Sequence, residues 1–121
     1  MKVGSRDIEA YAEISDERAI VSLLSKAVGE LQLDASQAAN LRIYEHNGIS
    51  VVVQPSEDGF VSVWIRGSTP WSSSPVLGRY LASNLRCTVH CDPEDEFPEI
   101  SPHSNVFLQI KGDSENLVAW G

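Results

Sequence analysis

The sequence lacks the patterns that identify common nucleotide-binding and hydrolytic sites. It contains no G-x-x-x-x-G-K-[ST] or G-x-G-x-x-G phosphate loop and no G-x-S-x-G nucleophile elbow. No apolar run approaches the roughly 20 residues that a membrane-spanning helix needs. Residues 1–14 have no apolar segment ahead of a cleavage site, which argues against a secretory signal. We therefore expect a cytoplasmic, non-enzymatic protein without a cofactor.

Basic residues are also scarce. The chain has nine Lys and Arg against 17 Asp and Glu, which gives a formal net charge of −8. Residues 87–121 carry most of this excess, with seven acids and one base. A negative field repels nucleic acid and anionic membranes and attracts basic proteins. The charge predicts a basic protein partner and neither nucleic acid nor membrane, although it could serve solubility alone.

The size and composition are those of a single globular domain. The chain has 121 residues, of which 42% are hydrophobic and 21% charged. A chain of this length can bury one core without disulfides or a structural metal. We predict one α+β domain over residues 1–121.

Two segments have helical patterns. An apolar stripe with a spacing of three and four residues follows Ser15, a candidate N-cap, and consists of Ile20, Leu23, Leu24, Ala27, Val28 and Leu31. The second segment has Ser74 as its candidate N-cap and Pro75 at the first helical position. Both helices are amphipathic and are expected to pack on a sheet.

The remaining segments favour strands. Residues 41–46, 49–54 and 60–66 form three β-rich runs, separated by an Asn-Gly pair and a Pro- and Gly-containing turn. Residues 60–66 are apolar on both faces, which predicts a central strand or a face that meets a partner. Further strands are expected at residues 86–91 and in two runs after residue 105, whereas residues 8–14 fit either a strand or a helix start. The predicted fold is α+β, a mostly antiparallel sheet of about five to six strands with two helices packed on it.

Both cysteines lie in the stretch RCTVHCDPEDEFPEI. Cys87, His90 and Cys91 are types that bind zinc. In a strand, however, Cys87 and Cys91 share the core face, about 13 Å apart at 3.3 Å per residue, while His90 points away. We expect two buried free cysteines and no metal, with a zinc site as the alternative.

The acids that follow are the predicted partner-binding site. A solvated cluster of this kind lacks the paired, contrasting environments that carboxylate catalysis needs, so no catalytic residue is assigned. Three prolines restrict this loop, and negative charge around apolar anchors suits protein recognition. Alternatively, Phe97 and Ile100 attach the loop to its own core. The predicted site residues are Asp92, Glu94, Asp95, Glu96, Phe97 and Glu99, with Trp64, Trp71, Trp120 and Tyr44 as further candidates for the same surface.

In size, charge and order of elements the chain resembles two bacterial classes. One is the immunity proteins, which neutralise toxins and often present an acidic face to a basic nuclease site. The other is the type III secretion chaperones, which SLLSKAVGELQL and LGRYLASNL resemble in helical pattern. The first resemblance implies an inhibitor of a basic partner, our main prediction. The second implies a dimer that holds an unfolded segment. A small enzyme or zinc-binding protein is the third possibility, and both monomer and homodimer remain open.

Overall fold

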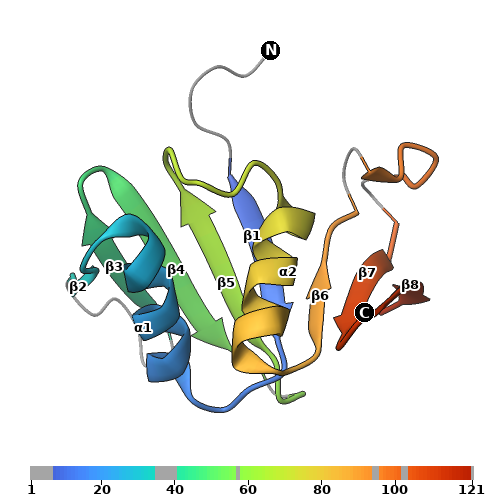
Figure 1. The fold of residues 1–121 in the computed structure, drawn as a ribbon, viewed down its shortest axis with the longest axis horizontal. Helices are drawn as coiled ribbons and strands as arrows, with labels where there is room; N and C mark the ends of the chain where they lie inside the picture. The colour runs from blue at the N-terminus through green and yellow to red at the C-terminus, as the bar shows by residue number, and fades with distance from the viewer. Residues whose placement is uncertain (1–6, 35–40, 57, 94–95, 102–103, 121) are drawn as a thin grey trace.

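The computed structural model describes residues 7–34, 41–56, 58–93, 96–101 and 104–120. Within these residues, two helices pack on one face of a single antiparallel sheet of eight strands (Figure 1). The elements in chain order are β1 (Ile8–Ala12), α1 (Glu17–Val28), β2 (Gln32–Leu33), β3 (Arg42–His46), β4 (Ile49–Pro55), β5 (Val61–Arg66), α2 (Ser74–Leu85), β6 (Val89–Cys91), β7 (Val106–Lys111) and β8 (Ser114–Ala119).

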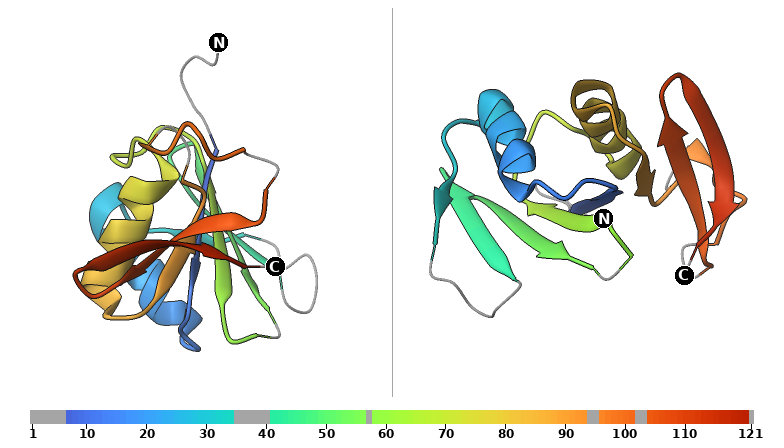
Figure 2. Two further views of the ribbon diagram at one scale, coloured as in Figure 1. Left: turned by 90° about the vertical axis from the view of Figure 1, so that its right-hand side faces the viewer. Right: turned by 90° about the horizontal axis from the view of Figure 1, so that it is seen from below.

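The strand order across the sheet is β2-β3-β4-β5-β1-β6-β7-β8. β1 is the junction: it pairs with β5 on one side, where Ile8 lies opposite Ile65, and with β6 on the other, where Ala10 lies opposite Cys91. The β7–β8 hairpin stands steeply against the plane of β3 and β4, so the sheet is strongly twisted (Figure 2). Figure 2 also shows both helices on the same side of the sheet.

The predicted α+β class and its two helices are confirmed, but the prediction of five to six strands is too low. Residues 8–12 are a strand and not a helix start, because they complete the ladder between β5 and β6. Strand β2 was missed because its two residues are too short to show a period. The three runs within residues 41–66 are confirmed as β3, β4 and β5, and β5 lies inside the sheet as predicted.

The local boundaries differ from the prediction by one to three residues. Asp16, not Ser15, caps α1 by accepting a hydrogen bond from the Arg18 amide, and Ser73 caps α2. Ser74 instead accepts a hydrogen bond from the Glu9 amide of β1 at 3.0 Å. The strand predicted from residue 86 begins at residue 89, because Arg86 ends α2 in the left-handed conformation, with φ 55° and ψ 48°.

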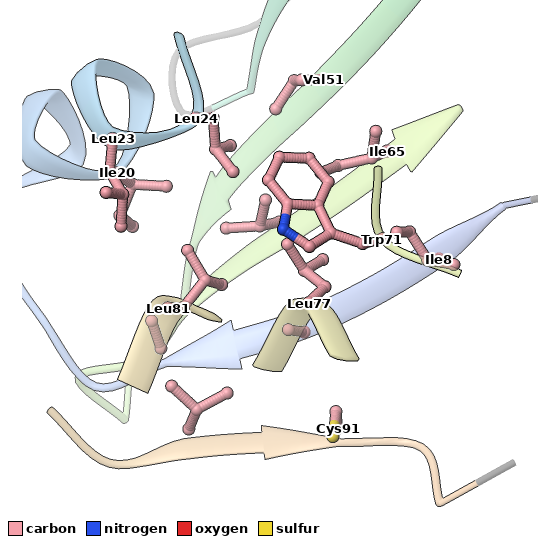
Figure 3. Packing of buried hydrophobic residues seen from close by; sticks show 14 of the residues in the cluster. Ile8, Ile20, Leu23, Leu24, Val51, Ile65, Trp71, Leu77, Leu81 and Cys91 are labelled. Carbon is pink, nitrogen blue, oxygen red and sulfur yellow. The ribbon is translucent and has the colours of Figure 1, made fainter. Parts of the chain in front are cut away.

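The core lies between the helices and the sheet. Alternate residues of β5, namely Val61, Val63 and Ile65, face this layer and are buried. Leu77 and Trp71 reach toward the sheet from the side of α2 (Figure 3). The helix approaches β6 closely at Gly78, where an added Cβ atom would lie 3.1 Å from the Cys91 sulfur. These contacts define one face of the sheet, and no described helix or strand covers the other face.

Candidate functional site

The structure describes only part of the predicted acidic site. Glu94 and Asp95 lie outside the described residues. Asp92 is half-buried, and Glu96 and Glu99 are exposed on the loop between β6 and β7. The partner-binding role of this loop therefore stays a prediction. The contacts of the loop show which of its residues already interact with the rest of the chain.

Glu96 takes part in an ion-pair network with the body of the protein. Arg79 of α2 donates to both carboxylate oxygens of Glu96, at 2.8 and 2.6 Å, and to both of Glu115 on β8, at 2.8 and 3.0 Å. These hydrogen bonds are the main reason that the pKa values of Glu96 and Glu115 lie below the ordinary glutamate value. The network attaches the loop to α2 and offsets part of its negative charge.

Phe97 is also engaged within the chain, because its half-buried side chain packs against the hydrophobic core. The backbone around it forms tight turns, in which the Ile100 amide donates to the Phe97 carbonyl at 2.9 Å. This matches the alternative interpretation, in which an apolar residue attaches the loop to its own core. Phe97 therefore has a contact within the chain, and its role in binding a partner stays a prediction.

The predicted strand alternation holds for residues 89–91, whereas the prediction that Cys87 is a buried residue of the same strand is wrong. Cys91 is fully buried on the core face, whereas His90 lies on the opposite face of β6. Cys87 precedes the strand and is half-buried, and burial is the main cause that raises the pKa of its thiol. The described residues contain no cluster of His, Cys, Asp and Glu side chains placed to hold a metal ion.

The uncovered face of the sheet, which we call the open sheet face, carries a group of rings. This aromatic cluster consists of Tyr11, Phe60, His90, Phe107 and Trp120. Trp120 lies at its centre, with ring centroids 5.0 Å from Tyr11 and 5.2 Å from Phe107. Its indole also lies 5.0 Å from Phe60 and 4.5 Å from the His90 ring, so one residue touches all the others.

His90 forms the buried floor of this cluster. Its ring is only 5% exposed and stacks on Phe60 with centroids 4.8 Å apart. Nε2 lies 3.0 Å from the Gln109 side-chain oxygen, which accepts its hydrogen. Nδ1 has no hydrogen-bond partner among the described residues. A buried polar atom in this state is uncommon in proteins.

The rings enclose an open hollow, which we call the corner hollow. It is lined by Tyr11, Asp58, Phe107 and Trp120. Burial, followed by the charge and hydrogen bonding of Glu9, raises the pKa of Tyr11 to about 12, so this phenol stays neutral at physiological pH. The hydrogen bond from Ser56 is the main cause that lowers the pKa of Asp58, which is therefore ionised. Two carboxylates thus lie beside a wall of aromatic rings.

A second apolar area lies on the same open sheet face, over β3, β4 and β5. Trp64 is 38% exposed, and the Arg66 guanidinium lies 5.2 Å from its ring centroid. Ile43 and Val52 line a hollow beside Trp64, with Glu45 and other polar residues on its border. Both ends of the open sheet face therefore present aromatic side chains.

The predicted supplementary aromatics divide between the two faces. Trp64 and Trp120 lie on the open sheet face. Trp71 is instead a core residue, 7% exposed, so it does not contribute to such a surface. Tyr44 lies on the helix side, away from the open sheet face, and donates to Glu17 of α1 at 2.7 Å, so its role in binding stays a prediction.

Comparisons of the chain with protein-family models, curated proteins and solved structures found no match. Among the described residues, no helix is long and apolar enough to cross a membrane. Any account of function therefore depends on the geometry and chemistry of the surface itself.

Proposed function

We propose that this chain is a non-enzymatic, cytoplasmic protein-binding module that recognises a basic protein, as an immunity-type inhibitor would. The open sheet face is its binding surface, with the aromatic cluster as the main contact area and Glu9 and Asp58 beside it. The observation that carries the proposal is the corner hollow: three aromatic rings and one carboxylate meet on a face that no described element covers.

The composition of this face suits an interface. Aromatic residues supply most of the affinity at protein–protein interfaces, because they bury a large area at a small cost in conformational entropy. Tyr11, Phe107 and Trp120 are all partly exposed, so they retain surface that a partner can bury. Carboxylates around such a centre steer a basic partner and fix its orientation.

The proposed interface is the open sheet face, whereas the sequence predicted the acidic loop. Glu96 is paired with Arg79 and Phe97 packs on the core, so both have partners within the chain. The loop and the rest of the acidic surface would then contribute long-range attraction without direct contact.

The test compares two variants with the same change in charge. Glu9→Lys with Asp58→Lys reverses the two acids of the open sheet face, and Glu94→Lys with Glu99→Lys reverses two acids of the loop. Partners captured from a lysate of the source cells are identified by mass spectrometry, purified, and titrated calorimetrically at low and high salt. Glu96 is left unchanged, because a lysine there would face Arg79 and disturb the fold.

We expect a basic partner that binds with 1:1 stoichiometry and more weakly at high salt. The sheet variant should weaken it about tenfold or more, and the loop variant by much less. The reverse order would return the interface to the acidic loop and refute its placement on the sheet. Salt-insensitive binding, or self-association through this face in analytical ultracentrifugation, would instead support a chaperone-like dimer. Thermal unfolding of each variant checks that it remains folded.

A further inference from the structure

The three outer rings of the aromatic cluster have a specific relative orientation. The ring planes of Tyr11 and Phe107 meet at 87°, those of Tyr11 and Trp120 at 75°, and those of Phe107 and Trp120 at 81°. Three planes that are each nearly perpendicular to the other two meet like the walls at the corner of a box. All three rings border the corner hollow, so this corner opens to solvent and is not filled by the rings themselves.

The electrostatics of this corner favour a cation. The faces of aromatic rings are negative, and a cation within about 6 Å of a ring centroid is attracted to them. Asp58 completes the lining, and no described lysine or arginine borders the hollow. Glu9 adds a second negative charge beside Tyr11, because its carboxylate helps to raise the pKa of that phenol.

Asp58 keeps an acceptor for an incoming group. Its Oδ1 atom accepts hydrogen bonds from the Ser56 hydroxyl and from the Phe60 amide, the latter at 3.2 Å. These bonds hold the carboxylate in place at the border of the hollow. Asp58 is exposed, and an ionised carboxylate offers several lone pairs on its two oxygens, so it can accept a further hydrogen bond from a ligand.

We propose that the corner hollow binds the guanidinium group of a single arginine side chain of the basic partner. A guanidinium is flat, so it stacks on aromatic faces, and it is more weakly hydrated than a lysine ammonium. One N–H group would donate to the Asp58 carboxylate while the plane lies against a ring. This inference rests on the proposed function, because the arginine belongs to the proposed basic partner. It specifies which side chain of that partner enters the hollow.

The hollow can be tested without the partner. The probe is the peptide acetyl-Gly-Arg-Gly-amide, compared with the same peptide carrying citrulline, which keeps the shape of arginine but is uncharged, and with a lysine peptide. Binding is followed by NMR through the indole signals of the three tryptophans. We expect saturable shifts of the Trp120 signal, with the arginine peptide binding about fivefold more tightly than the citrulline peptide and more tightly than the lysine peptide.

The variants locate the site on the protein. Trp120→Leu keeps an apolar side chain but removes the ring, and Asp58→Asn keeps the shape but removes the charge. Each should reduce the preference for arginine over citrulline to less than twofold. Trp64→Leu is the matched control, because it removes another exposed tryptophan of the same face outside the hollow, and it should leave the preference unchanged. Amide NMR spectra verify that each variant is folded.

Several results would overturn the inference: equal binding of the arginine and citrulline peptides, tighter binding of lysine, no shift of Trp120, or equal loss with Trp64→Leu. They can be separated from failure of the proposed function. A basic protein that binds the open sheet face equally well after Trp120→Leu would refute the arginine site but leave the function in place. If the chain binds the arginine peptide but its protein partners bind elsewhere, the arginine site stands and the proposed binding surface is refuted.

Discussion

The two faces of the sheet are built by the same strands but have different contents. On the face under α1 and α2, most side chains of the central strands are aliphatic and buried, as at Val53 and Ile65. The open sheet face carries the aromatic cluster and charged groups such as Glu9, and Trp64 on it is 38% exposed. The difference shows that apolar character alone does not separate the core from the exposed face of the sheet. What separates them is the kind of apolar side chain and whether another element covers it.

This comparison leads to measurable expectations. Substitutions on the covered face should mainly change the free energy of unfolding, and substitutions on the open sheet face should mainly change binding. The four predictions below begin with the largest effect.

Leu77→Ala should cause the largest loss of stability. Leu77 is fully buried between α2 and the sheet, so its truncation leaves a cavity and should reduce the free energy of unfolding by about 3 kcal/mol. Urea denaturation measures this change. The control is Leu33→Ala on β2, a leucine that is 55% exposed, where we expect a change of less than about 0.5 kcal/mol. Similar losses in the two variants would contradict the assigned core.

Two neighbouring valines of β4 compare the faces within one strand. Val53 is fully buried on the covered face, whereas Val52 lies half-buried on the open sheet face. Val53→Ala should cost about 2 kcal/mol and Val52→Ala about 0.5 kcal/mol, because only the first leaves an enclosed void. Chemical denaturation of both variants measures the two losses in the free energy of unfolding. An equal cost would mean that the open sheet face is covered in solution by something the described residues do not include.

Arg79→Gln tests the ion-pair network that attaches the loop to the helix layer. At pH 7 we expect a loss of about 1 kcal/mol, since the three groups form a network near the surface. The lowered pKa values of Glu96 and Glu115 mean that their contribution is present above the ordinary glutamate pKa of about 4.3. It disappears as the pH falls through the lowered values.

The difference between wild type and Arg79→Gln, followed by thermal unfolding, should therefore shrink below about pH 4. Arg66→Gln is the control, because the ion pair between Arg66 and Asp7 is longer, at 3.5 Å, and more exposed. A difference for Arg79→Gln that is independent of pH would show that the arginine acts by packing alone.

Arg86→Gly should have the smallest effect, and a stabilising one. Arg86 ends α2 with a positive φ, which glycine adopts without steric cost, so we expect a gain of about 0.5 kcal/mol. Ser22→Gly, in the middle of the exposed side of α1, should instead lose about 0.5 kcal/mol. Differential scanning calorimetry can resolve the two directions. A loss at residue 86 would argue against the left-handed cap.

Much of the fold could be predicted from local patterns, because they have local causes. The helical stripe of α1 and the Asn47-Gly48 turn depend on neighbouring residues. The role of β1 could not be predicted, because Ala10 and Glu9 are weak strand formers and the strand exists through its partners. The long loop after β6 was recognised, but not the link from Glu96 to Arg79, since sequence does not show which acids meet a base.

The aromatic cluster is the clearest case of what sequence reasoning missed. Its members come from β1, the turn before β5, β6, β7 and the residue after β8, and only the sheet order brings them together. One signal was present: residues 60–66 are apolar on both faces, which predicted a central strand or a partner face. Pairing Tyr11 with His90 and Phe107 required the registers of β1, β6 and β7.

The central position of β1 has a consequence for synthesis. Of the described strands β1 is synthesised first, but both of its neighbours are encoded much later, so the sheet is not complete until after β6 has been made. The half from β1 to β5 can assemble earlier, with one side of β1 left as an unpaired strand edge. During that interval the nascent chain offers the hydrogen bonds of β1 to any extended segment nearby. Efficient production of this protein should therefore depend on how quickly residues 89–91 follow.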